Sequence, residues 1–141
     1  MKQTSINNIN LIDIFKITDP DGRGNLSVIE KNFLPYSIKR VYYLYDVPSD
    51  SFRGGHAHIH QQEFLIALSG SFDVTIDNAN DKKKLTLNKP NKGLLIPTGI
   101  WRELENFSSG AICLVLSSGE FIEKDYIREY QDFLNGFKNK V

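Results

Sequence analysis

The stretch from Arg53 to Gly70 constrains the fold of this chain more than any other part of the sequence. It reads R-G-G-H-A-H-I-H-Q-Q-E-F-L-I-A-L-S-G and holds all three histidines of the protein, at positions 56, 58 and 60. Side chains two residues apart point to the same face of a β-strand, so these imidazoles share a face for as long as the strand stays regular. The apolar run over residues 63–68 predicts a buried strand, and Ser69 and Gly70 supply turn chemistry. We therefore expect a strand that carries imidazoles into a cavity, a short turn, and a second strand that returns.

The bulk properties of the chain exclude several classes of protein. A length of 141 residues predicts a single domain over residues 1–141. Lys and Arg together number 17, as do Asp and Glu, and the resulting near-zero net charge argues against a general nucleic-acid binder. The polar first ten residues lack a signal-peptide core, and no apolar run reaches the roughly 18 residues of a membrane span. We expect a cytoplasmic protein that binds neither nucleic acid nor a membrane. Cys113 is the only cysteine, which excludes an intramolecular disulfide and a Cys-based zinc site.

Short apolar and alternating segments fill most of the remaining chain. The period of residues 37–45 places Arg40 and Tyr42 on one face of a strand, with Val41 and Tyr43 on the other. Residues 18–25 form a turn that sets Arg23 between two glycines. Many short strands separated by turn signals are typical of a β-sandwich or barrel. Strands are expected over residues 11–17, 26–30, 37–45, 72–77, 85–87, 93–97, 100–104 and 111–117.

The C-terminal part has a different period. Over residues 125–137, apolar side chains recur at helical spacing. We expect one α-helix here, with its apolar face packed against the outside of the barrel or against a partner subunit. The apolar positions are Tyr126, Ile127, Tyr130, Phe133, Leu134 and Phe137.

Two spaced patterns resemble the signatures of the cupin barrels. The first is H-x-H, four residues, E, six residues and G, which begins at His56. The second is Gly93, then P-T-G at residues 97–99, then Arg102 and Asn106. In metal-binding cupins a histidine, the fourth metal ligand, stands where this chain has Arg102. The resemblance therefore implies an all-β cupin (jelly-roll) barrel with a C-terminal α-helix, and only part of a metal site.

A closer resemblance covers nearly the whole chain, from about residue 21 to about residue 133. The segments P-Y-S-I-K-R-V-Y-Y, R-G-G-H-A-H, G-x-x-I-P-x-x-x-W-R-E and D-Y-I-R-E-Y together resemble the WxcM-like nucleotide-sugar 3,4-ketoisomerases. Members of that family isomerise dTDP-4-keto-6-deoxyglucose to a 3-keto sugar without a metal or other cofactor. They act as homodimers in pathways to 3-amino-3,6-dideoxy sugars of bacterial surface glycans. The resemblance implies the same activity and a dTDP-linked keto sugar as substrate.

The residue types suit that reaction. Moving a ketone from C4 to C3 requires loss of the C3 proton, an enediol, and reprotonation at C4. A histidine, with an ordinary pKa near 6.5, suits the first step, and Tyr or Arg donors suit the enediolate. By resemblance, His56 is the principal base and His58 its partner in shuttling or positioning. Tyr42 and Arg40 hold the oxygens of the sugar.

The remaining expected site residues are arginines. Arg53 is expected to clamp the pyrophosphate, because a guanidinium offers two parallel donors. Arg23 and Arg102 stand at positions that vary with the C4 configuration of the product. Arg23 resembles the galacto-forming members and Arg102 the gluco-forming ones, and Arg102, at the cupin ligand position, leads us to favour gluco.

Several alternatives stay open at this point. Many family members have Lys and Gln where this chain has His60 and Glu63, and His56, His58 and Glu63 form a possible two-histidine, one-carboxylate metal triad. A metal-dependent cupin enzyme, a dTDP-sugar 3,5-epimerase and a non-catalytic sugar-binding cupin are therefore competing hypotheses. His60 is also compatible with a solvent-facing position, and Arg23 with a role in its turn alone.

Overall fold

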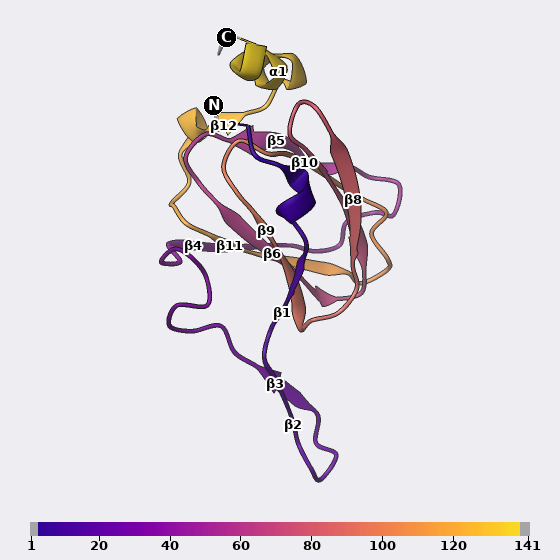
Figure 1. The fold of residues 1–141 in the computed structure, drawn as a ribbon. Helices are drawn as coiled ribbons and strands as arrows, with labels where there is room; N and C mark the ends of the chain where they lie inside the picture. Colours follow the sequence, from indigo (N-terminus) through magenta and orange to yellow (C-terminus); the bar gives the residue numbers. More distant parts are fainter. Residues whose placement is uncertain (1–2, 139–141) are drawn as a thin grey trace.

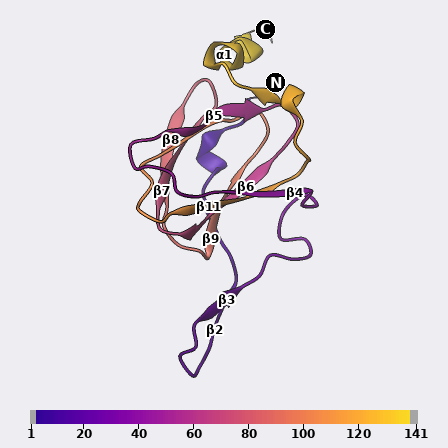
Figure 2. The same ribbon diagram turned by 180° about the vertical axis from the view of Figure 1, so that it is seen from behind.

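Two five-stranded antiparallel sheets form the body of the molecule (Figures 1 and 2). The computed structural model describes residues 3–138, with side chains up to Gly136. One sheet has the strand order β1-β9-β6-β11-β4 and the other β12-β5-β10-β7-β8. The bounds are β1 Leu11–Asp13, β4 Arg40–Leu44, β5 Arg53–His58, β6 Glu63–Ser69, β7 Phe72–Asp77, β8 Lys82–Leu87, β9 Lys92–Ile96, β10 Trp101–Glu105, β11 Ile112–Ser117 and β12 Tyr126–Ile127. A 3-10 turn, η1 (Ile6–Asn8), precedes β1.

The hydrophobic core lies between the two sheets. Strand β7 shows the pattern that builds it, because Phe72, Val74 and Ile76 are buried while the residues between them face outward in part. A second, smaller core covers the outer side of the first sheet, where the ring of Phe64 lies over Gly93 so closely that a Cβ there would meet it at 2.2 Å. The all-β expectation with one C-terminal helix is confirmed, and the arrangement of the sheets is compatible with a jelly roll.

The two strands that matter most to the site fold as their sequences predict. In β4, Arg40, Tyr42 and Leu44 turn inward, whereas Val41 and Tyr43 are exposed. Strand β5 carries His56 and His58 but ends at His58. His60 therefore leaves the shared face and lies exposed in the turn before β6.

Three expectations about element boundaries are wrong. Residues 11–17 form two strands, β1 and β2 (Lys16–Thr18), because the chain leaves the sheet at Ile14. The strand expected over residues 85–87 begins earlier, because Lys82, Lys83 and Lys84 also belong to β8. The helix α1 spans Tyr130–Lys138, and the start of the expected helix is instead a 3-10 turn, η2 (Glu123–Asp125), followed by β12.

The C-terminal helix packs where the sequence predicts. Phe133 is fully buried against Trp101 and Ala57 on the outside of the second sheet. Tyr130 contacts the Trp101 ring edge-on at 5.2 Å and donates to Asp77 Oδ2 at 2.6 Å. The side chain of Phe137, the last expected apolar position, lies outside the described residues. Within the described part of the chain, no helix is long and apolar enough to cross a membrane.

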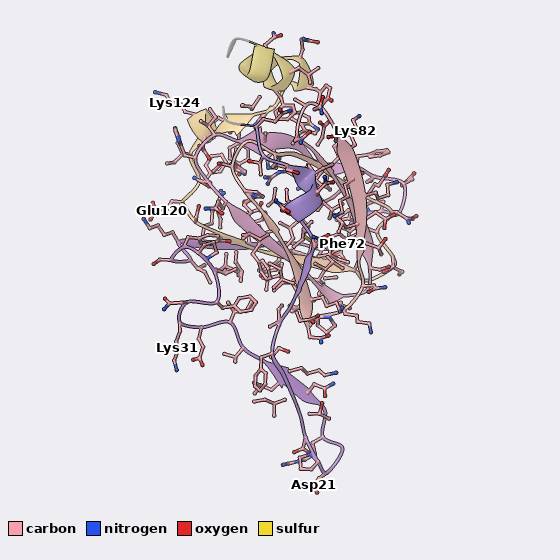
Figure 3. The ribbon with its side chains drawn as sticks, in the orientation of Figure 1. Asp21, Lys31, Phe72, Lys82, Glu120 and Lys124 are labelled. Atoms are coloured by element: carbon pink, nitrogen blue, oxygen red, sulfur yellow. The ribbon has the colours of Figure 1, made fainter. Side chains whose placement is uncertain are left out.

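A two-stranded ribbon projects from the body (Figures 1 and 3). It consists of β2 and β3 (Asn25–Ser27), which pair with each other and with no other described strand. Asp21, at its tip, is the labelled residue farthest from the sheets in Figure 3. Apolar side chains on and beside it are exposed, among them Phe15 at 68%, Ile17 at 50% and Leu26 at 58%. We call residues 15–28 the arm.

Candidate functional site

A cavity of about 560 Å³ opens between the two sheets. One wall is β4, β6 and β11 of the first sheet, and the other is β5 and β10 of the second. The segment between β11 and β12 closes one side. The lining residues are Arg40, Tyr42, Leu44, Phe52, Arg53, Gly54, Gly55, His56, Glu63, Leu65, Arg102, Leu104, Val115, Phe121, Tyr126 and Arg128.

Local backbone geometry brings β5 and β10 close together at the cavity. Arg102 lies opposite His56, but the pairing shifts register between Arg102 and Leu104. Gly54 has φ +89°, and a Cβ there would lie 2.8 Å from Leu104 Cδ1. Only glycine combines this backbone conformation with so close an approach. The bulge aims Arg102 and His56 into the same space.

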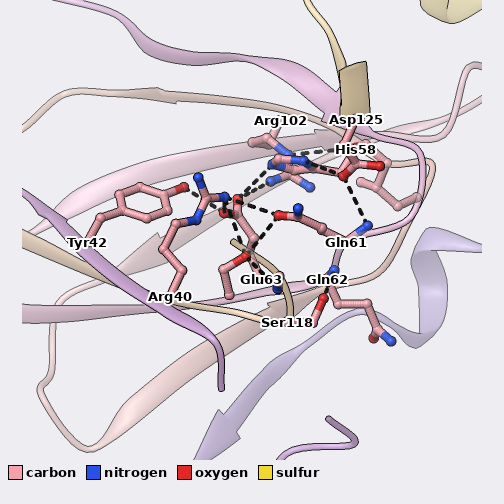
Figure 4. A network of polar contacts seen from close by, with 12 residues as sticks. Arg40, Tyr42, His58, Gln61, Gln62, Glu63, Arg102, Ser118 and Asp125 are labelled. Atoms are coloured by element: carbon pink, nitrogen blue, oxygen red, sulfur yellow. Dashed lines mark hydrogen bonds and ion pairs between the residues drawn. The ribbon is translucent and has the colours of Figure 1, made fainter. Parts of the chain in front are cut away.

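Glu63 is the centre of the polar network at the closed end of the cavity (Figure 4). It is 1% exposed. Its Oε1 accepts a hydrogen bond from Arg102 Nη1 at 2.7 Å, and its Oε2 accepts one from the Tyr42 hydroxyl at 2.8 Å. Arg40 Nη2 lies 3.5 Å from Oε2, and His58 Nε2 lies 3.3 Å from Oε1. One carboxylate thus holds four side chains that come from both sheets.

This network fixes the charge of Glu63. Burial alone would raise the pKa of the carboxyl, but the contacts with His58, Arg102 and Tyr42 outweigh burial and lower it to about 2. The same carboxylate, together with burial, raises the pKa of Tyr42 far above its ordinary value. Glu63 is therefore ionised and Tyr42 keeps its proton at neutral pH.

His56 lines the cavity as a neutral imidazole. Burial, followed by the charges of Arg102 and His58, lowers its pKa to about 2. Its Nε2 is buried and has no hydrogen-bond partner among the described residues. The ring is held by the His58 ring at 4.9 Å and by the Tyr126 ring at 4.9 Å. His56 can therefore accept a proton.

His58 lies behind His56 and does not line the cavity. It is fully buried, and its Nδ1 is 3.0 Å from Asp125 Oδ2. Its Nε2 faces Glu63 at ion-pair distance, although the two are not aligned as a hydrogen bond. His58 is thus placed to act through its neighbours rather than on a ligand directly.

The donor set does not suit a metal ion. One donor atom each from His56, His58 and Glu63 lies within 4.8 Å of the others. However, the Arg102 guanidinium already supplies a positive charge to Glu63 at 2.7 Å, and Tyr42 takes the second carboxylate oxygen. A divalent cation at this point would have to displace or lie against a buried guanidinium, which costs free energy.

Comparison with known proteins places the chain in a family. Residues 7–138 match the family described as WxcM-like, C-terminal (FdtA). The chain belongs to this family. It is 42% identical over 114 residues to a protein of Aneurinibacillus thermoaerophilus named TDP-4-oxo-6-deoxy-alpha-D-glucose-3,4-oxoisomerase, which covers 80% of this chain and 82% of the relative.

Solved structures of 3,4-ketoisomerases share the fold. One from Helicobacter canadensis superposes with a TM-score of 0.88 at 38% identity, over 93% of this chain and 98% of the other. A mutant of QdtA from Thermoanaerobacterium thermosaccharolyticum, in complex with TDP-4-keto-6-deoxyglucose, superposes with a TM-score of 0.88 at 36% identity, over 95% and 96% of the two chains.

The structure brings most of the expected site residues together within a single chain. Tyr42, His56, Arg40 and Arg102 line the cavity, and Arg53 lines it from the start of β5. His58 lies behind His56, in contact with Glu63 but not on the cavity wall. Arg23 is the expected site residue that lies far from the cavity. Its side chain is 77% exposed and ion-paired with Asp19 at 2.9 Å in the turn of the arm. The structure does not place Arg23 at the cavity of its own chain, because among the described strands the ribbon pairs only with itself and it points away from the body. A role of Arg23 in binding the substrate stays a prediction.

Sequence reasoning missed the contribution of the C-terminal segment. Asp125 is buried behind His58, and Tyr126 and Arg128 line the cavity. All three lie in the D-Y-I-R-E-Y motif, which was assigned to a helix. Tyr126 and Ile127 are not helical in the structure, because they form β12 and pair with His58 and Ala57 of β5. Gln61, whose Oε1 accepts from Arg40 Nη2 at 3.1 Å, was also missed.

Replacing Glu63 tests the network. We expect Glu63→Gln to lower the free energy of unfolding by about 3–5 kcal/mol, because it leaves the Arg102 guanidinium buried without its counter-charge. Urea denaturation measures this. Glu105→Gln is the matched control, since its ion pair with Lys84 at 2.9 Å is partly exposed and screened by solvent, and its loss is expected to change stability far less than the loss of Glu63. Equal effects of the two substitutions would contradict the central role of Glu63.

The lowered pKa of His56 makes stability depend on pH. Below its ordinary pKa of 6.5, the imidazole is protonated in the unfolded chain but stays neutral in the folded one, so stability falls as the pH drops. The loss from this group between pH 8 and pH 5 is about 2 kcal/mol. Urea denaturation at the two pH values should show a smaller loss for His56→Asn than for the wild type. His60→Asn, at an exposed position, is expected to behave like the wild type; a His56→Asn variant with an undiminished loss would refute the shift.

Proposed function

We propose that the protein is a sugar-nucleotide 3,4-ketoisomerase that converts dTDP-4-keto-6-deoxyglucose to a dTDP-3-keto-6-deoxyhexose. One observation carries this proposal. A neutral imidazole, that of His56, lines a cavity whose closed end presents the Arg102 guanidinium and the Tyr42 hydroxyl on a single carboxylate. A proton acceptor beside fixed donors is what an enolisation needs. The named relatives support the same reaction.

The reaction follows from these groups. His56 removes the C3 proton, and the electron pair of that bond forms a double bond to C4 while the C4 oxygen takes up negative charge. Arg102, Arg40 and Tyr42 stabilise this enediolate by charge and by hydrogen bonding. The hydroxyl proton moves from O3 to O4, and the protonated His56, whose proton exchanges with solvent, delivers a proton to C4, which leaves the ketone at C3 and a hydroxyl at C4. His58 positions His56 or passes protons to it. No step requires a metal.

The charge of the cavity suits a nucleotide diphosphate. Four arginines, Arg40, Arg53, Arg102 and Arg128, line it, against the one carboxylate of Glu63. Arg53 stands at the edge, away from the buried network, and is our candidate for the pyrophosphate. An arriving anion also offsets the positive charge that lowers the pKa of His56, which makes this imidazole a stronger base once the substrate is bound.

Proton exchange at the sugar tests the proposal. The protein, dialysed against EDTA, is mixed with dTDP-4-keto-6-deoxyglucose in D2O and followed by proton NMR. We expect loss of the C3 proton signal and a 3-keto product with deuterium at C4, because both carbons exchange with solvent through the enediol. His56→Asn is expected to lower the rate by about 10²- to 10⁴-fold, the usual contribution of a general base.

Other outcomes of this experiment would select a competing function. Activity that returns only with an added divalent metal would favour a metal-dependent cupin enzyme. Deuterium at C5 would indicate a 3,5-epimerase, and no exchange under either condition a different substrate or a binding protein. The coupling pattern at C4 of the product distinguishes gluco, which Arg102 leads us to favour, from galacto.

We also infer that the protein acts as a homodimer in which the arm packs on a second copy. The arm exposes Phe15, Ile17 and Leu26, and the outer face of the edge strand β4 exposes Val41 and Tyr43 at 56% and 59%. Exposed apolar surface on this scale marks an interaction site. If Arg23 binds the substrate, it does so in the cavity of the partner. The cytoplasmic location expected from the sequence stays a prediction.

Mixed dimers test whether Arg23 acts across the interface. Arg23→Ala and His56→Ala are each expected to be nearly inactive alone. In a mixed dimer, the Arg23→Ala chain supplies an intact His56, and the His56→Ala chain supplies an intact Arg23 to the same cavity. Activity should therefore return when the two variants are unfolded together and refolded. If subunits assort at random, one site in four is intact, and the activity per active site should reach about a quarter of the wild-type value. If Arg23 acts in its own chain or not at all, mixing restores nothing beyond the activity of the separate variants.

A further inference from the structure

We propose that Asp125 is a positioning residue of this site, which fixes the ring of His58 through Nδ1 and so holds the proton-handling groups in place. The inference rests on the proposed ketoisomerase function for its catalytic consequence, but its structural part stands without it. Asp125 reaches the site from η2, more than sixty residues after His58 in the chain.

The contacts of Asp125 are those of a fully engaged carboxylate. It is 4% exposed. Its Oδ2 lies 3.0 Å from His58 Nδ1 and accepts the backbone N–H of Gln61 at 3.1 Å. Its Oδ1 accepts the backbone N–H of His60 at 2.7 Å. Among the described residues, the polar contacts given for the Asp125 side chain are with the turn that follows β5 and with the histidine that ends that strand.

These contacts determine which nitrogen of His58 carries a proton. Both oxygens of Asp125 already accept backbone N–H groups and act as acceptors, so Nδ1 is assigned as the donor. The other ring nitrogen, Nε2, is then the atom that faces Glu63 Oε1 at 3.3 Å. This arrangement, in which a carboxylate orients an imidazole by accepting from its far nitrogen, sets a proton on Nδ1 and the angle of the ring.

The orientation of His58 matters because two functional groups depend on it. The His58 ring packs edge-on against His56, with ring centroids 4.9 Å apart. It also lies beside Glu63, which accepts from Tyr42 and Arg102. Turning or flipping His58 would therefore disturb the proposed base on one side and the carboxylate that holds the donors on the other.

A purely structural role would explain some of the contacts of Asp125. Asp125 fastens the segment before β12 to the turn after β5, and the Ile59 N–H also donates to the Asp125 backbone oxygen at 3.0 Å. A role limited to fastening predicts lost stability and nothing else. A positioning role predicts a changed His58 tautomer and a lower kcat in a protein that still folds, and the two roles are therefore separable.

The test uses Asp125→Asn. Asparagine keeps one acceptor oxygen, which can serve either the His60 N–H or the pair formed by His58 Nδ1 and the Gln61 N–H. With the oxygen on His60, the amide NH2 group faces Nδ1 as a donor, and we expect the proton of His58 to move to Nε2, toward Glu63 Oε1. Nitrogen-15 NMR of the labelled imidazoles shows directly which ring nitrogen of His58 carries a proton. The chain has three histidines, so their signals can be assigned by single substitutions. We expect Nδ1 of His58 to carry a proton in the wild type and to lack it in Asp125→Asn.

The kinetic consequence is measured on the same variant. We expect kcat to fall about 10²-fold, the lower end of what a misplaced acid–base group costs, with KM within about 3-fold of the wild type. In a His58→Gln background, Asp125→Asn should lower kcat by no more than about 2-fold further, because its effect passes through His58. Asp77→Asn is the matched control: Asp77 is 2% exposed and accepts from Tyr130 and the Ala79 N–H, but lies outside the cavity. It should keep the wild-type kcat.

The outcomes separate this inference from the proposed function. An unprotonated Nδ1 in the wild type overturns the inference, whether or not Asp125→Asn folds. An active wild type with unchanged kcat in Asp125→Asn, or with multiplicative losses in the double variant, overturns it as well and leaves the ketoisomerase intact. A wild type that exchanges no proton of the keto sugar sinks the proposed function, and the NMR measurement then still decides how Asp125 holds His58.

Discussion

The ion pair between Glu63 and Arg102 is the interaction on which the site depends. Glu63 belongs to β6 of one sheet and Arg102 to β10 of the other, and both are at most 1% exposed. A single buried charge is costly, and each of these is tolerated because the other compensates it. The pair therefore ties the two sheets together at the closed end of the cavity. Tyr42 from the first sheet and His58 from the second contact the same carboxylate, so this ion pair fixes the positions of the proposed catalytic groups.

The sequence predicted those parts of the molecule that depend on local periodicity. Alternation along residues 72–77 reappears as the buried and half-buried faces of β7. The same logic placed Arg40 and Tyr42 on the inner face of β4, and His56 inside the cavity on β5. The cupin spacing between His58 and Glu63 also proved informative, since the turn between them brings both residues to the same end of the site.

The parts that the sequence did not predict depend on contacts between distant segments. Tyr126 and Ile127 fit a helical period as well as a strand, and only their pairing with β5 decides for the strand. Asp125 reads as an ordinary first-turn acid of a helix, whereas its place behind His58 results from that same pairing. The two glycines that flank Arg23 correctly predict a turn. No local pattern predicts that this turn lies far from the body of the molecule. The sequence thus indicates the type of local structure, but not the position that contacts between distant segments give to it.

The arm has a consequence for how the chain reaches its working form. A two-stranded ribbon is at best marginally stable in water, and its open edges can template pairing with other chains. Until the arm is covered, a newly made or dilute chain carries Phe15 and Ile17 in solvent and is exposed to misassembly with unrelated edges. In the proposed dimer, where a second copy covers the arm, the final step of folding is bimolecular and the apparent thermal stability rises with protein concentration. Dimerisation would then also protect against aggregation, because a chain without a partner leaves the apolar side chains of the arm exposed to solvent.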